Sequence, residues 1–249
     1  LNIPLVIYEN NYVLGRANKF LLPFSKKIFT TTNEIHKFPE KYKKKVIKVG
    51  HILREEVINY SQVSKQNIDA FFSIIVLGGS QGAEIFGLII PTVIKKINEM
   101  GHKIKIYHQC IKKQKESLIN FYKKNKIQNE VFEFSNNILK YILESNLAIT
   151  RCGASTTAEL IYTKTPFIAV PYPHSMDNHQ YFNAVNYENK GYCWMLEQSN
   201  FNEENLFNLI LKILKDKKNL ELKTENMREN FDKDTNQNIE KEVNKILQI

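Results

Sequence analysis

Two polar blocks in the second half of the chain carry the side chains best suited to bind a ligand. The first block, Thr156 with Glu159, follows an apolar run at 147–150 and a break at 152–154. We expect the run to be a buried strand and Thr156 to open a helix. The N–H groups and partial positive charge of a helix N-terminus suit an anionic or hydroxyl-rich ligand. A carboxylate one turn later could accept hydrogen bonds from two vicinal hydroxyls, such as those of a ribose.

Glu159 also has a purely structural interpretation. Residues 156–159 form a capping box, in which Glu159 folds back onto the Thr156 N–H. Taken alone, this stretch favours the cap over the ribose site.

The second polar block shifts that balance toward a ligand site. It follows another apolar run, 166–170, and the turn 171–173, and it contains His174, Ser175, Asp177, Asn178, His179 and Gln180. In a doubly wound sheet, ligands sit beyond the carboxyl ends of the strands, and both polar blocks lie at such ends. One shared cleft accounts for both.

The elements that position these blocks alternate regularly from residue 71 onward. The predicted strands are 71–77, 103–108, 131–134, 147–150, 166–170 and 192–196. Helical patterns separate them, and further helices are expected at 202–215, 220–230 and 236–247. The alternation predicts an α/β fold with a parallel sheet and helices on both faces.

A glycine-rich turn follows the first of these strands. Gly78-Gly79-Ser80-Gln81-Gly82-Ala83 leads into a helix, an arrangement that lets backbone N–H groups approach phosphate. The turn lacks the Lys-Ser/Thr of a Walker A loop and does not fit G-x-G-x-x-G. Because tight strand-to-helix turns use glycine in any case, that alternative stays open.

The first 70 residues form a smaller α/β region. Strands are expected at 3–8, 27–31 and 46–49, a short helix at 16–22 and a linker at 59–67. Since residue 3 already lies in an interior strand pattern, we expect the chain to start in mid-fold.

Composition favours a globular, cytoplasmic protein. The 249 residues are 43% hydrophobic, with neither a signal-peptide pattern nor the run of about 18 apolar residues that spans a bilayer. Cys110, Cys152 and Cys193 are expected to be reduced core thiols, with no metal site. The net charge of +9 reflects either a general abundance of lysine or attraction to an anionic membrane or phosphorylated substrate. No nucleic-acid-binding motif is present.

Four blocks of the sequence resemble the MurG family of bacterial glycosyltransferases, within glycosyltransferase family 28. They are residues 3–11 with Gly15 and Asn18, 49–50 with Arg54, 78–83, and 151–159 with 177–180 and Asn183. That family adds N-acetylglucosamine from UDP-GlcNAc to lipid I (undecaprenyl-diphospho-MurNAc-pentapeptide), forming lipid II for peptidoglycan synthesis. The resemblance implies an inverting transferase without cofactor, peripheral on the cytoplasmic face of the inner membrane.

The resemblance also implies an architecture and a set of site residues. The fold would be GT-B, with residues 1–53 the last part of the acceptor domain and residues 54–249, terminal helix included, the UDP-GlcNAc-binding donor domain. Ser80 and Gln81 would contact the diphosphate and sugar, with Arg54 near the diphosphate. Ala154 and Thr156 would line the cleft, and Glu159 would hold the ribose. By the same match, His179 and Gln180 would bind the N-acetylglucosamine hydroxyls, and Asn11, with Glu9, would lie on the acceptor side.

Several positions depart from the family pattern, namely Tyr8, Asn10, His51, Ile52, Cys110 and Ile111. The family's N-terminal glycine-rich loop is also absent from these 249 residues, and we assign no catalytic base. The D-x-D spacing at 232–234 suggests a metal site in some glycosyltransferases, but here it lies between two surface helices. Two rival functions remain: a non-catalytic UDP-sugar-binding fragment or subunit that needs a partner for the acceptor half, and a GT-B epimerase.

Overall fold

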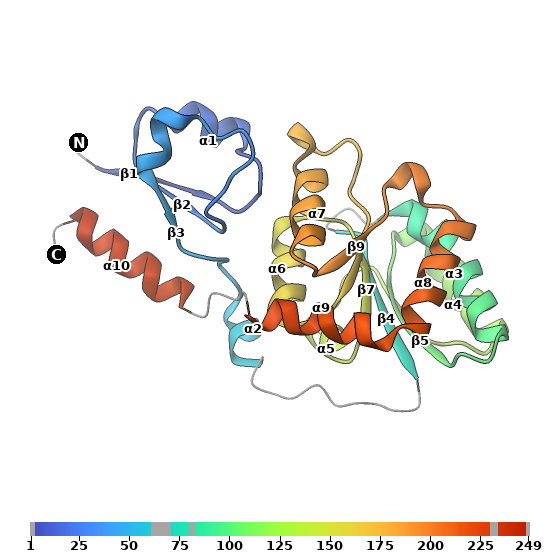
Figure 1. Ribbon diagram of the computed structural model, residues 1–249. Helices are drawn as coiled ribbons and strands as arrows, with labels where there is room; N and C mark the ends of the chain where they lie inside the picture. Colours follow the sequence, from blue (N-terminus) through green and yellow to red (C-terminus); the bar gives the residue numbers. More distant parts are fainter. Residues whose placement is uncertain (1–2, 61–70, 80–82, 230–233, 248–249) are drawn as a thin grey trace.

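The chain folds into two α/β units joined side by side (Figure 1). The computed structural model describes residues 3–60, 71–79, 83–229 and 234–247. The smaller unit contains a three-stranded sheet and the larger a six-stranded sheet. Among the described residues, no helix has the length and apolar character needed to cross a membrane.

The smaller unit is a parallel sheet covered on both faces. Its strands β1 (Leu5–Glu9), β2 (Ser25–Thr30) and β3 (Val46–Lys48) lie in sequence order, linked by α1 (Arg16–Leu21) and η1 (Glu40–Lys45). Ile7 and Ile28 pack into one apolar cluster, while Phe29 packs into another with Ile246. Ile246 belongs to the last helix, α10 (Thr235–Leu247), which lies beside this sheet in Figure 1.

The last helix, α10, packs on the smaller unit. The predicted domain division groups the terminal helix with residues 54–249, whereas its apolar residues Ile239, Val243 and Ile246 cover the first sheet. The apolar stripe of an amphipathic helix packs on whichever face is left open, and the sequence does not say which. The boundary between residues 53 and 54 stays a prediction.

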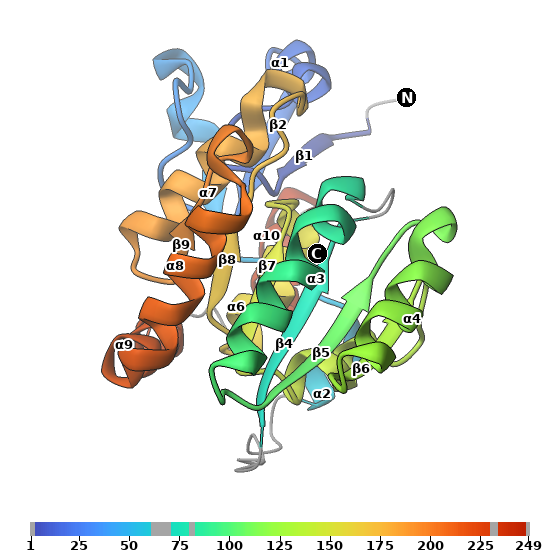
Figure 2. The ribbon, with the colours of Figure 1, turned by 90° about the vertical axis from the view of Figure 1, so that its right-hand side faces the viewer.

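The larger unit has six parallel strands in the order β6-β5-β4-β7-β8-β9 (Figure 2). The strands are β4 (Phe72–Leu77), β5 (Ile104–Gln109), β6 (Gln128–Phe132), β7 (Leu147–Thr150), β8 (Phe167–Ala169) and β9 (Cys193–Met195). Its helices are α2 (Glu55–Tyr60), α3 (Glu84–Glu99), α4 (Lys115–Lys124), α5 (Ile138–Leu143), α6 (Ala154–Tyr162), α7 (His179–Asn189), α8 (Glu203–Lys215) and α9 (Lys217–Glu229). The α/β class with a parallel sheet is therefore confirmed.

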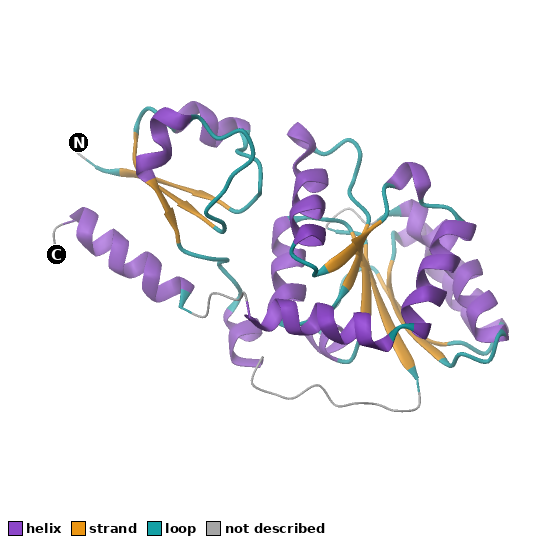
Figure 3. Cartoon of the chain, viewed as in Figure 1, coloured by secondary structure: helices purple, strands orange, loops and turns teal. Residues whose placement is uncertain are grey.

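Helices cover both faces of the six-stranded sheet (Figure 3), because alternate strand residues are apolar on each side. On one face, Ile74 and Val76 pack with residues of α3, α4 and α8. On the other, Ile75 and Leu77 pack with residues of α5, α6, α7 and α9. Because both faces of the sheet are buried, polar groups are expected at the amino and carboxyl ends of its strands.

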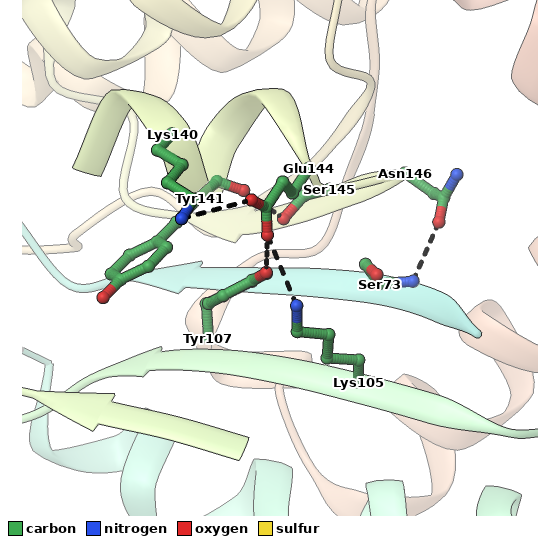
Figure 4. A network of polar contacts seen from close by, with 8 residues as sticks. All are labelled: Ser73, Lys105, Tyr107, Lys140, Tyr141, Glu144, Ser145 and Asn146. Carbon is green, nitrogen blue, oxygen red and sulfur yellow. Dashed lines mark hydrogen bonds and ion pairs between the residues drawn. The ribbon is translucent and has the colours of Figure 1, made fainter. Parts of the chain in front are cut away.

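The two ends of the large sheet differ in character. At the amino ends of the strands, Glu144 accepts a hydrogen bond from Tyr107 and forms an ion pair with Lys105 at 3.3 Å, while Asn146 accepts from the Ser73 N–H (Figure 4). Burial, followed by the Glu144 hydrogen bond, raises the pKa of Tyr107. These polar groups satisfy one another and close this edge.

The carboxyl ends contain the topological switch point. From β4 the chain moves outward through β5 and β6, then returns to β7 beside β4 and continues in the other direction. In open α/β sheets, ligands usually bind in the crevice beyond the carboxyl ends of the strands at such a point.

Some predicted boundaries were wrong. The strand expected at 131–134 occupies Gln128–Phe132, and helix α2 had not been predicted. Most of the predicted linker at 59–67 lies outside the described residues. All three cysteines are buried and unpaired, as predicted.

His108 makes the stability of the large unit depend on pH. It is fully buried, its Nδ1 lies 2.8 Å from the Tyr122 hydroxyl, and its Nε2 has no partner among the described residues. Burial lowers its pKa from 6.5 to about 3. Below pH 6.5, the His108 side chain is protonated in the unfolded chain but stays neutral in the folded chain. Stability is thus full above that pH and is lost as the pH falls toward 3.

We therefore expect His108→Gln to flatten the pH dependence. Between about pH 7.5 and 5, the wild type should lose about 2 kcal/mol of unfolding free energy relative to the variant. Urea denaturation at both pH values measures this difference. Parallel pH profiles for the two proteins would contradict it.

Candidate functional site

The crevice at the switch point is lined by tight backbone turns. Gly79, after β4, has φ +80°, and a Cβ atom at Gly79 or at Gly153, after β7, would meet no atom of the described residues within 4 Å. A ligand could therefore approach both turns closely. Ser80 and Gln81, predicted to contact the diphosphate and sugar, lie outside the described residues.

Helix α6 begins earlier than predicted. Its N-cap is Gly153 rather than a residue near Thr156, and no side chain caps it. The capping-box interpretation of Glu159 is therefore wrong, since Thr156 already lies inside the first turn. Ala154 is buried and Thr156 half-buried at this N-terminus, whose first N–H groups have no intrahelical partner.

Glu159 instead pairs with Arg54 from the segment joining the two units. Nε of Arg54 donates to Oε1 at 2.9 Å and Nη2 donates to Oε2 at 3.1 Å, a bidentate contact. The hydrogen bonds that Arg54 donates to Glu159 raise the pKa of Arg54. The structure thus brings two predicted ligand-binding residues together, although it places Arg54 on the carboxylate assigned to the ribose.

Gln180 and His179 begin α7, immediately after η3 (Met176–Asn178). Oε1 of Gln180 accepts hydrogen bonds from the N–H groups of Cys152 at 3.1 Å and Tyr172 at 2.9 Å. Nδ1 of His179 lies 2.8 Å from the Met176 carbonyl oxygen. The carbonyl end of Gln180 thus ties the turn after β7 to the turn after β8.

The approach to α7 is strained. Asp177 and Asn178 have φ values of +52° and +54°, in the left-handed region that side chains other than glycine rarely adopt. The Asp177 carboxylate also pairs with Arg16 of the smaller unit at 3.0 Å. Such strain persists only where surrounding contacts enforce the backbone path, and functional sites are a common setting.

Asn183, one turn further along α7, joins the two units. It is 1% exposed, and its Oδ1 accepts from the Tyr12 N–H at 2.8 Å. Its Nδ2 donates to Oδ1 of Asn11 and to the Cys152 carbonyl, both at 3.1 Å. Asn11, predicted on the acceptor side, therefore lies at the contact between the units.

Glu9 and Tyr8 organise the loops of the smaller unit. The buried Glu9 carboxylate accepts hydrogen bonds from the Asn11 N–H, the Gly15 N–H and the Asn18 amide. The Tyr8 hydroxyl donates to the Gly50 carbonyl and accepts from the Ile52 N–H, both at 3.1 Å. Tyr8 and Ile52, two of the departures from the family pattern, thus contact each other.

A cavity of about 340 Å³ lies between the same two units, lined by Thr31, Lys48, Ile161 and Lys190 among others. None of the predicted site residues lines it. Ile161 is two residues beyond Glu159 and so faces the opposite side of α6. The predicted donor site and this cavity therefore lie on different sides of the helix.

Sequence reasoning gave no individual role to Arg151, Asn183 or Asp177. Two of them had a weak signal: Arg151 directly follows the strand Leu147–Thr150, which is apolar up to its last residue, and Asn183 shares the apolar face of α7 with Ala184 and Tyr187. A polar residue at an apolar position indicates a specific buried partner, which the sequence does not identify.

The Asn183 contacts give a test of how the units are held. Asn183→Ala would leave the Tyr12 N–H and the Cys152 carbonyl without this partner and should lower the unfolding free energy by about 1–3 kcal/mol. Asn189→Ala, at an exposed position of the same helix, should cost less than about 0.5 kcal/mol. Urea denaturation compares the two. Equal costs would mean that Asn183 contributes nothing specific.

Comparison with known proteins places this geometry in a family. Residues 73–239 match the model of the glycosyltransferase family 28 C-terminal domain. A curated relative from Pelagibacter ubique (strain HTCC1062) is 38% identical over 92% of this chain. One from Rickettsia felis (strain ATCC VR-1525 / URRWXCal2) is 36% identical over 91%. Both are named UDP-N-acetylglucosamine--N-acetylmuramyl-(pentapeptide) pyrophosphoryl-undecaprenol N-acetylglucosamine transferase. The chain spans 64% and 65% of their lengths.

Solved structures show the same fold. The crystal structure of Acinetobacter baumannii MurG aligns with a TM-score of 0.80 at 24% identity, over 98% of this chain and 68% of that one. S. aureus MnaA in complex with UDP aligns with a TM-score of 0.68 at 10% identity, over 99% of this chain and 70% of that one. The two-unit arrangement is therefore the GT-B type, and the chain belongs to glycosyltransferase family 28, whose C-terminal domain it contains.

Proposed function

We propose that this chain binds UDP-GlcNAc at the carboxyl edge of its six-stranded sheet and forms the donor half of the transferase that converts lipid I to lipid II. The observation that carries the proposal is the position of Glu159 and Gln180. They come from different helices: Glu159 pairs with Arg54 one turn after the start of α6, and Gln180 accepts from the Cys152 N–H in the turn after β7. The names of the relatives support the donor and the acceptor.

Each side chain has a chemical role in this proposal. A carboxylate has about four lone-pair positions, so Glu159 can hold Arg54 and still accept two ribose hydroxyls. Gln180 uses its carbonyl oxygen on two backbone N–H groups, which directs its amide NH₂ and the adjacent His179 toward the sugar. The N-terminus of α6 supplies N–H groups for the diphosphate.

The proposed reaction is a displacement at the sugar. The muramoyl 4-hydroxyl attacks the anomeric carbon of UDP-GlcNAc and inverts it, giving its proton to a general base to which we assign no residue, while the bond to UDP breaks and the diphosphate takes up the electron pair. Preorganised N–H groups and cations stabilise that developing charge. The acceptor lies on the side of Asn11, which contacts α7 through Asn183.

We also propose that the smaller unit rests on an anionic membrane surface, where a lipid-linked acceptor would be found. Phe20 and Phe24 are 74% and 69% exposed, and their ring centroids lie 6.3 Å apart. The exposed Lys19 adjoins them in sequence. Exposed aromatic rings beside cations suit the interface of an anionic bilayer.

The donor site is tested by UDP binding. Glu159→Gln keeps the size of the side chain but removes its charge, and a lost charged hydrogen bond costs about 1.5–3 kcal/mol. The affinity for UDP and for UDP-GlcNAc should therefore fall by about tenfold or more in calorimetric titrations.

Glu221→Gln, at an exposed position on α9, is the matched control and should bind UDP like the wild type. If Glu159→Gln also bound like the wild type, Glu159 would have no part in the site. A wild-type chain that binds GDP-sugars as well as UDP-GlcNAc would refute the donor assignment itself.

The membrane surface is tested by sedimentation with vesicles containing about one third phosphatidylglycerol. Replacing both Phe20 and Phe24 by Ser removes the apolar contact, so binding should fall by about tenfold or more. Phe134→Ser removes a phenylalanine that is 78% exposed on the larger unit and should have no effect. Equal losses in the two variants would contradict a specific membrane face.

A further inference from the structure

Arg151 is a buried cation at the switch point. It follows β7 directly and is 8% exposed. Nη1 donates to the carbonyl oxygens of Val170 at 3.1 Å and Pro171 at 3.4 Å, and Nη2 donates to Oε1 of Gln198. The guanidinium thus ties the end of β7 to the segments after β8 and β9.

Two aromatic rings flank the same guanidinium. Its Cζ atom lies 5.0 Å from the ring centroid of Phe86, in the first turn of α3, and 5.3 Å from that of Tyr172. Ring faces attract cations, and so do carbonyl oxygens, but neither carries a full negative charge. Within the described ranges, no carboxylate lies within ion-pair distance of Arg151.

A buried charge without a counter-ion is costly, and folded proteins normally pair such groups. Burial lowers the pKa of Arg151, yet an arginine remains protonated at neutral pH. Arg151 lies two residues before Gly153, the N-cap of α6, and its guanidinium packs on Phe86 in the helix that follows β4, so the charge lies near the predicted diphosphate position. A negatively charged ligand there would supply the missing counter-charge.

We propose that Arg151 is the fixed positive charge of the donor site, which favours the diphosphate of a nucleotide through its electric field while its Nη1 and Nη2 groups hold the surrounding turns. This inference rests on the proposed function. It assigns charge selectivity to a residue bound to carbonyl, amide and aromatic groups, rather than to an exposed arginine such as Arg54. At an effective dielectric constant of about 20, one charge within about 10 Å changes affinity by roughly tenfold.

The test compares the affinities for UDP, UMP and uridine, which differ in charge but share the nucleoside. Arg151→Gln keeps a planar donor and removes the charge, so UDP should bind about tenfold more weakly, UMP should lose less and uridine less than about twofold. Arg151→Lys keeps the charge and should retain most of the wild-type ratio of UDP to uridine affinity.

If Arg151→Gln does not fold, substitutions of Gln198 test the same inference with Arg151 unchanged. Gln198→Glu puts a carboxylate beside the guanidinium and should reduce UDP affinity by about tenfold without affecting uridine. Gln198→Ala, the matched control, removes the hydrogen bond alone and should leave the ratio unchanged. Thermal unfolding checks that each variant folds.

Two outcomes would overturn the inference. Equal losses of affinity for UDP and uridine in Arg151→Gln or Gln198→Glu would make Arg151 a purely structural clamp, while leaving the proposed function intact. A wild-type chain that does not bind UDP would refute the proposed function and this inference together.

Discussion

The strand order of the six-stranded sheet is the constraint on which the rest of the structure depends. Because helices bury both faces of a parallel sheet, only its ends can hold polar groups. The amino end is closed by the Glu144 and Asn146 contacts. At the carboxyl end, the reversal between β4 and β7 separates the following segments. That reversal places Gly79, Arg151 and the start of α6 around one crevice.

The contacts between the two units are made by elements at the carboxyl end of the six-stranded sheet. The polar contacts described above that the larger unit makes with the smaller unit or the joining segment come from α6, η3 and α7: Glu159, Asp177 and Asn183. Gln180, which belongs to the predicted sugar site, lies three residues before Asn183 on α7. A change in the position of α7 would therefore alter the donor side and the acceptor side together. The strained residues Asp177 and Asn178 are where such a change would be absorbed.

The sequence predicted the larger unit well because its signals are local. Apolar runs and helical spacing identified all six strands, and turn residues located their ends. The start of α6 was missed because Thr156 and Glu159 have the spacing of a capping box, whereas Gly153 caps the helix without a side chain. The local sequence does not distinguish a helix start at Gly153 from one near Thr156. Arg54, which binds Glu159 in place of the Thr156 N–H, lies 105 residues away in the sequence.

The same limit applies to the site. The resemblance to known motifs named Arg54, Glu159 and Gln180, but not which groups they contact before a ligand arrives. Arg151 and Asn183 gained their importance only through burial and long-range partners, which no spacing along the chain reveals. The packing of α10 on the first sheet was unpredictable for the same reason.

The described polar side chains of the candidate site largely satisfy one another. The carbonyl oxygen of Gln180 holds two N–H groups, and Glu159 holds Arg54. A ligand that had to break these bonds would lose much of the energy it gained. The groups still able to hydrogen-bond a ligand are the unused lone pairs of Glu159, the amide NH₂ of Gln180 and the N–H groups at the start of α6. Binding at this edge would therefore add hydrogen bonds to a preorganised framework, which lowers the entropic cost of recognition.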